Sequence, residues 1–328
     1  MRWFARRLAF YLFAIWVALT VNFLLPRLMP GDPVAGLLQH LSPAQLSSNP
    51  GLIETYRALL GGGNHSIWSD YVTYLHRIMH FNFGLSTSNY PTPVSEVVGR
   101  TLPYSIFLVG VAFLLAFVIG TLVGMVAGWR RGGLVDNVFV PVFMTIGAFP
   151  AFFTALLGLW ILGLKLNWFP IQHAYGNDVT PGFNWAFLSS VGRHSELPIL
   201  VIVAAFAGGW VLNMRAVMIN TIGEDYVTMA RAKGLRDRRV MTWYAGRNAI
   251  LPPLNGFAAQ FATAVGGLVF IEFIFSYPGA GYTLQNAILG NDYPLAQAIL
   301  VTLSVCVIFA NLIMDIFNLI LDPRLRTA

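Results

Sequence analysis

The chain consists of long apolar runs separated by shorter polar or charged segments. Six of these runs reach the length of about 20 residues that a helix needs to cross a hydrocarbon layer roughly 30 Å thick. They occupy residues 8–25, 104–129, 138–164, 197–218, 254–275 and 295–321. Helices buried in a soluble core can be equally apolar, but six such runs in one chain favour lipid. The pattern predicts an all-α integral membrane protein with six transmembrane helices.

The first and third runs differ from a simple span. Arg2, Arg6 and Arg7 precede the first run, which is the charge layout of a signal peptide. The run is long for such a peptide, however, and no small-residue cleavage site follows, so we expect an uncleaved first helix. The third run contains Pro141 and Pro150, which we expect to kink it.

Polar segments divide the chain into three parts. Residues 1–25 form a cytoplasmic N-terminus and the first transmembrane helix. Residues 26–103 form a small extracytoplasmic insertion, which is rich in Gly and Pro and has room for short amphipathic helices, for example at 67–81. Residues 104–328 form a core of five transmembrane helices, which includes a charged loop at 219–251.

Composition agrees with a membrane protein. Hydrophobic residues make up 56% of the chain and charged residues 10%, against about 25% charged residues in a typical soluble domain. The formal charge of +6 reflects where basic residues lie between the spans and does not indicate a nucleic-acid partner. Cys306 is the single cysteine, which excludes a disulfide within the chain and a metal site built from several cysteines.

Basic residues also predict the orientation. If the N-terminus is cytoplasmic, 14 of the 20 Lys and Arg residues lie on that side, and six of these are in the 219–251 loop. The segment between the last two spans, 276–294, has no Lys or Arg. By the positive-inside rule, both termini and the charged loop face the cytoplasm.

The charged loop has the composition of two short helices around Gly234. Glu224 and Asp225 suit a helix N-terminus, where carboxylates interact favourably with the dipole. Gly234 is suited to end that helix, and a second helix is expected at about 236–250, ending before Pro252 and Pro253.

In the first of these helices, three- and four-residue spacings place Tyr226, Met229, Ala230 and Lys233 on one face. Such a face suits a groove on a partner protein. A basic amphipathic segment that contacts only lipid head groups has a similar pattern, and spacing alone does not separate the two interpretations.

Catalytic signatures are missing from the sequence. A phosphate-binding loop needs Lys followed by Ser or Thr, but Lys165 and Lys233 are followed by Leu and Gly. The six histidines form no HExxH pair. His76 and His80 have the spacing to share a helix face, where a solvated surface is the simpler interpretation than a metal site. We therefore expect no catalytic residue, metal or cofactor in this chain.

Several intramembrane residues have two interpretations. Gly120, Gly124 and Gly128 recur every four residues, which favours close packing with a neighbouring helix over a specific gate. Glu272 lies about one turn from the outer end of its span. It either reaches the interface or serves a gate or pathway, because ionisable groups in spans are costly and often functional.

Motifs along nearly the whole chain resemble the permeases of ABC importers. The run ARAKGL at 230–235, followed by RNAILP at 247–252, is similar to their signature cytoplasmic loop. GDP at 31–33, FGLS at 83–86, ExxFxxPGxG at 272–281, DYP at 292–294 and LDPR at 321–324 are similar to the dipeptide/oligopeptide and nickel branch. Within this branch, the chain resembles the first of two permease subunits.

The resemblance implies a type I ABC-importer permease fold and a multi-pass protein of the bacterial inner membrane. It implies a second permease subunit, two ATPase subunits that bind ATP and Mg, an extracytoplasmic substrate-binding protein and surrounding lipid as partners. The loop would couple to an ATPase through Glu224, Asp225, Tyr226, Met229, Ala230, Ala232, Lys233, Gly234, Leu235 and Arg238. A gate or pathway role is implied for Glu272, Phe275 and Pro278.

The loop departs from the general importer pattern. Importer permeases usually carry Glu-Ala-Ala before the loop glycine, whereas Thr228, Met229 and Ala230 stand in those positions here. The acids lie earlier, at Glu224 and Asp225, so which acid contacts the partner stays open. Peptides are the expected cargo, with nickel or another small solute as the alternative. A secondary transporter is disfavoured because no inverted repeat is visible.

Overall fold

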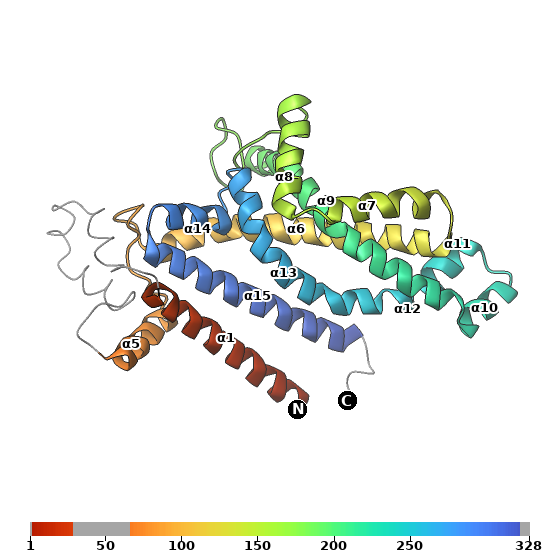
Figure 1. Ribbon diagram of the computed structural model, residues 1–328, viewed down its shortest axis with the longest axis horizontal. Coiled ribbons are helices and arrows are strands. Elements are labelled where there is room, and N and C mark those ends of the chain that lie inside the picture. Colours follow the sequence, from red (N-terminus) through yellow and green to blue (C-terminus); the bar gives the residue numbers. More distant parts are fainter. Residues whose placement is uncertain (1, 29–65, 322–328) are drawn as a thin grey trace. The chain divides into compact units, whose positions relative to one another are not determined.

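The computed structural model describes residues 2–28 and 66–321 (Figure 1). Over these residues the chain is helical, with a single isolated β-bridge between Leu85 and Pro93. The GDP motif, residues 29–65 of the 26–103 insertion and most of the LDPR motif lie outside the described residues. At 67–81, where the sequence indicates an amphipathic helix, α5 (Ile67–Met79) forms and is capped by the side chain of Ser66.

The described helices match the six expected spans in position. Four of them are long and apolar enough to cross a membrane as single helices, and a bent pair forms a fifth candidate. The four are α1 (Arg2–Leu28), α6 (Val94–Trp129), α9 (Trp185–Ile222) and α15 (Tyr293–Leu321). The sixth, α13 (Leu251–Ile274), has 24 residues and thus the length of a span. The all-α membrane fold predicted from the sequence is confirmed.

The third run is more strongly bent than expected. It forms η1 (Val135–Phe139, π-helical) with α7 (Val140–Gly147), and then α8 (Ala151–Gly158) with η2 (Leu159–Lys165, π-helical). The two halves meet at 106°, close to a right angle, as Figure 1 shows for α7 and α8. The chain leaves the helix at Ala148 and restarts after Pro150, which is in extended conformation. The expected kink is therefore a break.

The broken pair still connects opposite ends of the neighbouring helices. At its start, Asp136 binds Arg215, which lies in the last turns of α9. After its end, the N–H of His173 donates to the carbonyl of Phe275, which follows the last residue of α13. Because α9 and α13 run in opposite directions, these two contacts lie at opposite ends of the two helices. Between Asp136 and His173 the chain therefore passes from one end of these helices to the other, which is the path expected of a broken span.

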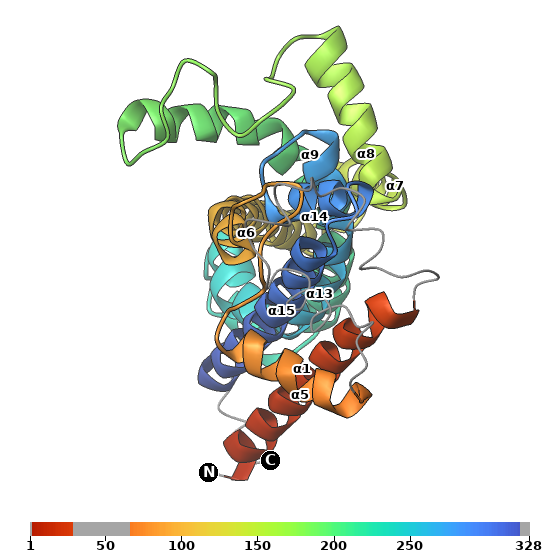
Figure 2. The same ribbon diagram turned by 90° about the vertical axis from the view of Figure 1, so that its left-hand side faces the viewer.

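Two compact units make up the chain, and each is described by itself. The first contains residues 1–105 and 278–309. In it, α5 crosses α1, which Figure 2 shows, and Phe23 packs on the rings of Tyr71 and Tyr74 at 5.1 and 5.3 Å. The hydroxyl groups of Thr20 and Tyr71 are 2.7 Å apart and hydrogen-bonded.

Asp292 is the polar centre of the first unit. Its buried carboxylate accepts hydrogen bonds from Ser86 Oγ at 2.6 Å, from Ser88 N–H at 2.9 Å and from Leu295 N–H at 3.2 Å. We call this arrangement the Asp292 latch. It joins the FGLS and DYP motifs, which are about 200 residues apart in sequence, and it caps the start of α15. α14 (Ala280–Leu289) belongs to the same unit, where Ala280 N–H donates to Ser105 Oγ.

The second unit contains residues 106–277 and 310–328. Its core is aromatic: Trp210 of α9 stacks on Phe257 of α13 with ring centroids 5.7 Å apart, and Phe117 of α6 meets both rings edge-on. Burying three large rings from three helices holds these spans together. At one end of this core lies the charged loop.

Candidate functional site

The first loop helix is α10 (Asp225–Ala232). Glu224 precedes it in extended conformation and Asp225 lies in its first turn, where a carboxylate is favourable. The helix ends where Gly234 adopts φ +71° and donates its N–H to Arg231 O at 2.9 Å. A side chain is strained at this φ, although no other atom lies within 4 Å of the position its Cβ would take. Glycine is thus required at this position because φ is positive, and not because a Cβ would clash with other atoms of this chain.

α10 has one buried side and one exposed side. Val227 and Ala230 point inward, with Ala230 2% exposed, whereas Tyr226, Met229 and Lys233 are exposed, Met229 at 60%. The sequence predicted that Tyr226, Met229, Ala230 and Lys233 share one face suited to a partner, and this prediction was wrong for Ala230. Ala230 lies on the same side of α10 as Val227, about one turn further along. Its side chain packs against this chain, so it is not available to another protein.

The remaining predicted loop residues take different positions. Glu224, Asp225 and Ala232 are exposed around α10, and Arg238 is exposed beyond Gly234. Leu235 is half-buried and packs against the core below the loop. Most of the residues predicted to couple to an ATPase are therefore exposed, whereas Ala230 and Leu235 pack against the rest of the chain.

α10 packs on a buried apolar cluster in which three of the eight members are methionines. It contains Val227 and Ala230 of α10, Met125 of α6 and Met214 and Met218 of α9, and α10 is in direct contact with α9. We call this the methionine cluster; it also includes Val240, Ala245 and Ala249 from the segment after Gly234. Unbranched, flexible Met side chains adapt to shifts of their neighbours. The cluster can therefore hold α10 on two spans while tolerating small movements.

The ends of α6 and α9 are themselves in close contact. A Cβ at Gly120, Gly124 or Gly128 would lie 2.4–2.7 Å from an atom of α9, and at Gly124 that atom is the backbone oxygen of Val211. Real Cβ atoms do not approach so closely, so the glycine repeat lets the two helices pack backbone to backbone. The packing interpretation of this repeat is confirmed, and α6 and α9 form one support for α10.

Trp129, the last residue of α6, ties the loop to that support. Its indole N–H donates to Asp237 Oδ2 at 2.8 Å, and the guanidinium carbon of Arg231 lies 4.5 Å from the ring centroid. Asp237 and Arg231 lie on opposite sides of Gly234 in sequence. The segments before and after Gly234 therefore both contact Trp129.

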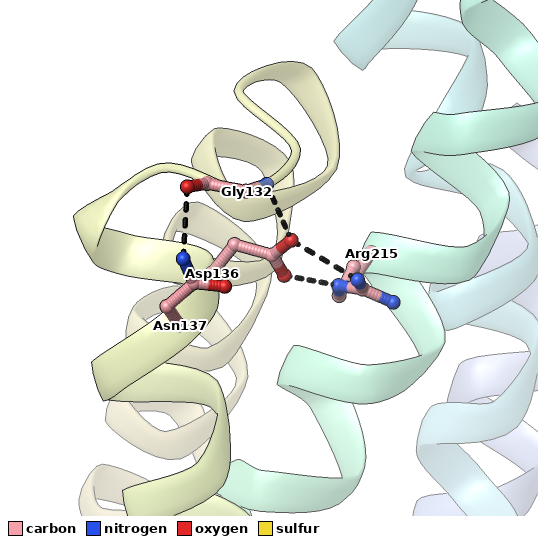
Figure 3. Close-up of polar contacts among 4 residues, drawn as sticks. All are labelled: Gly132, Asp136, Asn137 and Arg215. Carbon is pink, nitrogen blue, oxygen red and sulfur yellow. Dashed lines mark hydrogen bonds and ion pairs between the residues drawn. The ribbon is translucent and has the colours of Figure 1, made fainter.

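Asp136 and Arg215 form an ion pair beside the methionine cluster (Figure 3). Arg215 Nε and NH2 donate to the two carboxylate oxygens at 2.5 and 3.1 Å, and Gly132 N–H donates to Asp136 Oδ2 at 3.0 Å. Asp136 is buried. Sequence reasoning counted Arg215 only as an inside charge and missed Asp136. The sequence did contain a signal for this pair, because Asp136 lies at the edge of one apolar run and Arg215 lies near the edge of another.

After Gly234 the chain is less regular than expected. The predicted helix at 236–250 consists of α11 (Asp237–Arg239), η3 (Val240–Gly246, π-helical) and α12 (Arg247–Ala249). Pro252 and Pro253 do not merely end it, because they lie in the first turn of α13, where proline's missing N–H needs no partner.

The residues proposed for a gate or pathway lie at the other end of α13. Glu272 is 2% exposed and Phe275 is fully buried. The carbonyl of Glu272 accepts from Tyr277 N–H at 2.8 Å, and that of Phe275 accepts from His173 N–H at 3.1 Å. Glu272 therefore does not reach a surface of this chain. Pro278 is half-buried and belongs to the first unit.

The histidine pair in α5 has the geometry of a surface helix. The rings of His76 and His80 lie 4.4 Å apart, and His80 Nδ1 is hydrogen-bonded to the carbonyl of His76 at 2.8 Å. Within the described residues, no three His, Cys, Asp or Glu side chains come together as metal ligands would.

Comparison with known proteins identifies the family. Residues 120–327 match the family described as binding-protein-dependent transport system inner membrane component. A putative peptide permease of Brucella suis is 32% identical over 311 residues, 94% of each chain. A dipeptide transport system permease of Lactococcus lactis is 30% identical over 99% of each chain, and an oligopeptide transport system permease of Bacillus subtilis is 30% identical over 93%. The chain therefore belongs to the inner membrane components of binding-protein-dependent transport systems.

Proposed function

We propose that this chain is a permease subunit of an ATP-driven importer and forms half of a pathway for di- or oligopeptides. Peptide cargo is supported by the names of the relatives, which are peptide, dipeptide and oligopeptide permeases. Nickel or another solute is less well supported. Membership of a binding-protein-dependent family also argues against a secondary transporter.

The partners follow from the same assignment. A second permease subunit completes the pathway, two ATPase subunits bind ATP and Mg, and an extracytoplasmic binding protein delivers the substrate. The chain itself is the non-catalytic membrane subunit, with both termini in the cytoplasm, as its basic residues favour.

One observation carries the coupling role: α10 is exposed on one side and anchored to two spans on the other. Tyr226, Met229 and Lys233 remain accessible, while Val227 and Ala230 contact α9 through the methionine cluster. A partner that moves the exposed side can therefore pass that movement to the spans through α9 and the methionine cluster. ATP-dependent closure of an ATPase dimer would in this way favour one arrangement of the spans.

A graded series at Gly234 tests this role. Gly234→Asn tolerates the left-handed conformation, Gly234→Ala carries strain on the order of 1–2 kcal/mol, and Gly234→Arg adds bulk. Because no atom lies within 4 Å of a Cβ there, Gly234→Ala tests the backbone strain, and Gly234→Arg tests added bulk and charge at an exposed position. We expect peptide-stimulated ATPase activity to fall in the order Asn, Ala, Arg.

The measurement uses proteoliposomes containing this chain and the subunits that copurify with it, with and without a peptide-loaded binding protein. Equal activities for Ala and Arg would leave only a backbone role for Gly234. If Gly234→Arg assembles and transports like wild type, the coupling proposal is wrong. Stimulation by a metal and not by peptides would keep the architecture and overturn the cargo.

A further inference from the structure

A second surface is formed by Gly234 and the segment that follows it in the sequence. It is an open hollow of about 1060 Å³, and no carboxylate lines it. We call it the arginine groove. The residues that matter for its chemistry are Arg236, Arg238, Arg239, Arg247, Trp243 and Tyr244.

Among the described residues, the four arginines of the groove have no ion-pair partner. All four side chains are exposed. The nearest acid in sequence, Asp237, is engaged with Trp129. Four guanidinium groups around one hollow repel one another, so the site favours an anion from another molecule.

The depth of the groove follows from the packing of η3. The buried side of this segment contacts Met125, and a Cβ on Gly246 would lie 2.9 Å from the Met125 methyl carbon. Met125 is in the last turns of α6, and Met218 of the same cluster is in the last turns of α9. The segment therefore packs at the ends of α6 and α9, and the ends of spanning helices meet the head-group region.

The exposed side of the same segment has the residues of a membrane interface. Arg239, Trp243 and Arg247 follow one another at four-residue intervals and therefore lie along one side. Trp243 is 68% exposed, although it is large and mostly apolar. Tryptophan is enriched at the level of lipid head groups. Arg247 lies just before α13 enters the membrane.

We propose that the arginine groove binds the phosphate head group of an anionic phospholipid in the leaflet on this side. Guanidinium groups bind phosphate through paired hydrogen bonds, and basic residues next to a span attract anionic lipid. Trp243 packs beside the glycerol region of the same lipid. The loop thus has two surfaces with different partners: the exposed side of α10 faces protein, and the arginine groove faces lipid.

Native mass spectrometry of the full-length chain, purified with its copurifying subunits and stripped of lipid in detergent, tests the proposal. Phosphatidylglycerol is titrated in, with phosphatidylcholine as the zwitterionic comparison. We expect Arg239→Gln/Arg247→Gln to weaken phosphatidylglycerol retention about tenfold or more, since both charges that attract the phosphate are removed. The matched control is Arg130→Gln/Arg131→Gln, two exposed arginines after α6 that do not line the groove, which should weaken retention clearly less than the groove pair.

A charge-preserving variant and a competitor sharpen the result. Arg239→Lys/Arg247→Lys should retain phosphatidylglycerol better than the Gln pair but less well than wild type, because Lys keeps the charge without the planar fork. Inorganic phosphate at millimolar concentration should not displace the lipid. Displacement by phosphate would indicate a site for free anions and overturn the lipid assignment.

Two further outcomes would also overturn it. Unchanged phosphatidylglycerol retention in the Gln pair would show that the groove is not the lipid site. If that pair keeps its lipid but loses a copurifying ATPase subunit, the groove binds an acidic protein surface instead. Subunit stoichiometry is read from the same spectra, so a failure of the lipid proposal is distinguishable from a failure of the proposed importer assembly.

Discussion

The Asp292 latch and the methionine cluster hold their elements together in different ways. In the latch, a buried carboxylate accepts three hydrogen bonds of 2.6–3.2 Å from fixed directions. In the methionine cluster, Met125, Met214 and Met218 make non-directional contacts with small side chains. Hydrogen bonds to a buried charge define one geometry, since any shift leaves a donor or acceptor unpaired. Thioether side chains can instead repack.

This difference suits the positions of the two regions. The latch fixes the start of α15 and part of the insertion after α1, where a stable shape is useful. The cluster lies under α10, the element proposed to move with a partner. Elements that are meant to shift without unfolding are better held by adaptable apolar contacts than by a directional polar network.

The largest loss of stability is expected from Asp292→Ala. The buried donors of Ser86 and Leu295 and the N–H of the exposed Ser88 lose their acceptor, and each buried unsatisfied group costs roughly 1–3 kcal/mol. We expect the free energy of unfolding of the purified protein to fall by roughly 3 kcal/mol or more, measured by denaturation in nanodiscs. Asp292→Asn is the matched control, because its one remaining carboxamide oxygen should preserve part of the network. If the Ala variant is as stable as wild type, the latch is not a fixed point.

An intermediate loss of stability is expected when the Asp136–Arg215 ion pair is broken. This pair is a directional contact that lies beside the methionine cluster. Removing one partner of a well-buried pair costs about 3–5 kcal/mol. Because the Arg215 side chain is 29% exposed, we expect Arg215→Gln to cost only about 1–2 kcal/mol.

A double-mutant cycle separates the pair from other effects of these substitutions. Asp136→Asn combined with Arg215→Gln should cost less than the sum of the two single changes, since each single change leaves one unpaired charge and the double variant leaves none. Strict additivity would mean that the ion pair contributes nothing, and that the start of the broken span is held by packing alone.

Local features of this fold could be predicted from the sequence. Apolar runs located the spans, because hydropathy over about 20 residues decides where a helix crosses lipid. The end of α10 could be placed because Gly234 is the residue that tolerates a positive φ there. The repeat of Gly120, Gly124 and Gly128 indicated close packing, although it did not identify α9 as the neighbour.

Features that depend on distant residues could not be predicted. Asp136 pairs with Arg215, and Ser86 with Asp292, across 79 and 206 residues respectively. Pro150 gave an ambiguous signal, since prolines inside spans usually kink a helix that continues, whereas here α7 ends and α8 starts anew at 106°. Ala230 lies between the two sides of α10, so only its packing against the methionine cluster shows that it points inward.

The smallest effect is expected from Met218→Leu, and it addresses the comparison directly. Swaps that conserve volume in apolar cores usually cost less than about 1.5 kcal/mol, and neighbouring methionines can adjust to the new shape. Asp292→Glu is an equally conservative change, but the added methylene moves the carboxylate away from three fixed donors. We therefore expect the midpoint of unfolding to change little in Met218→Leu and to fall clearly in Asp292→Glu. Equal losses in the two variants would mean that the methionine cluster is as rigid as the latch, and that α10 moves only as part of a rigid body with α6 and α9.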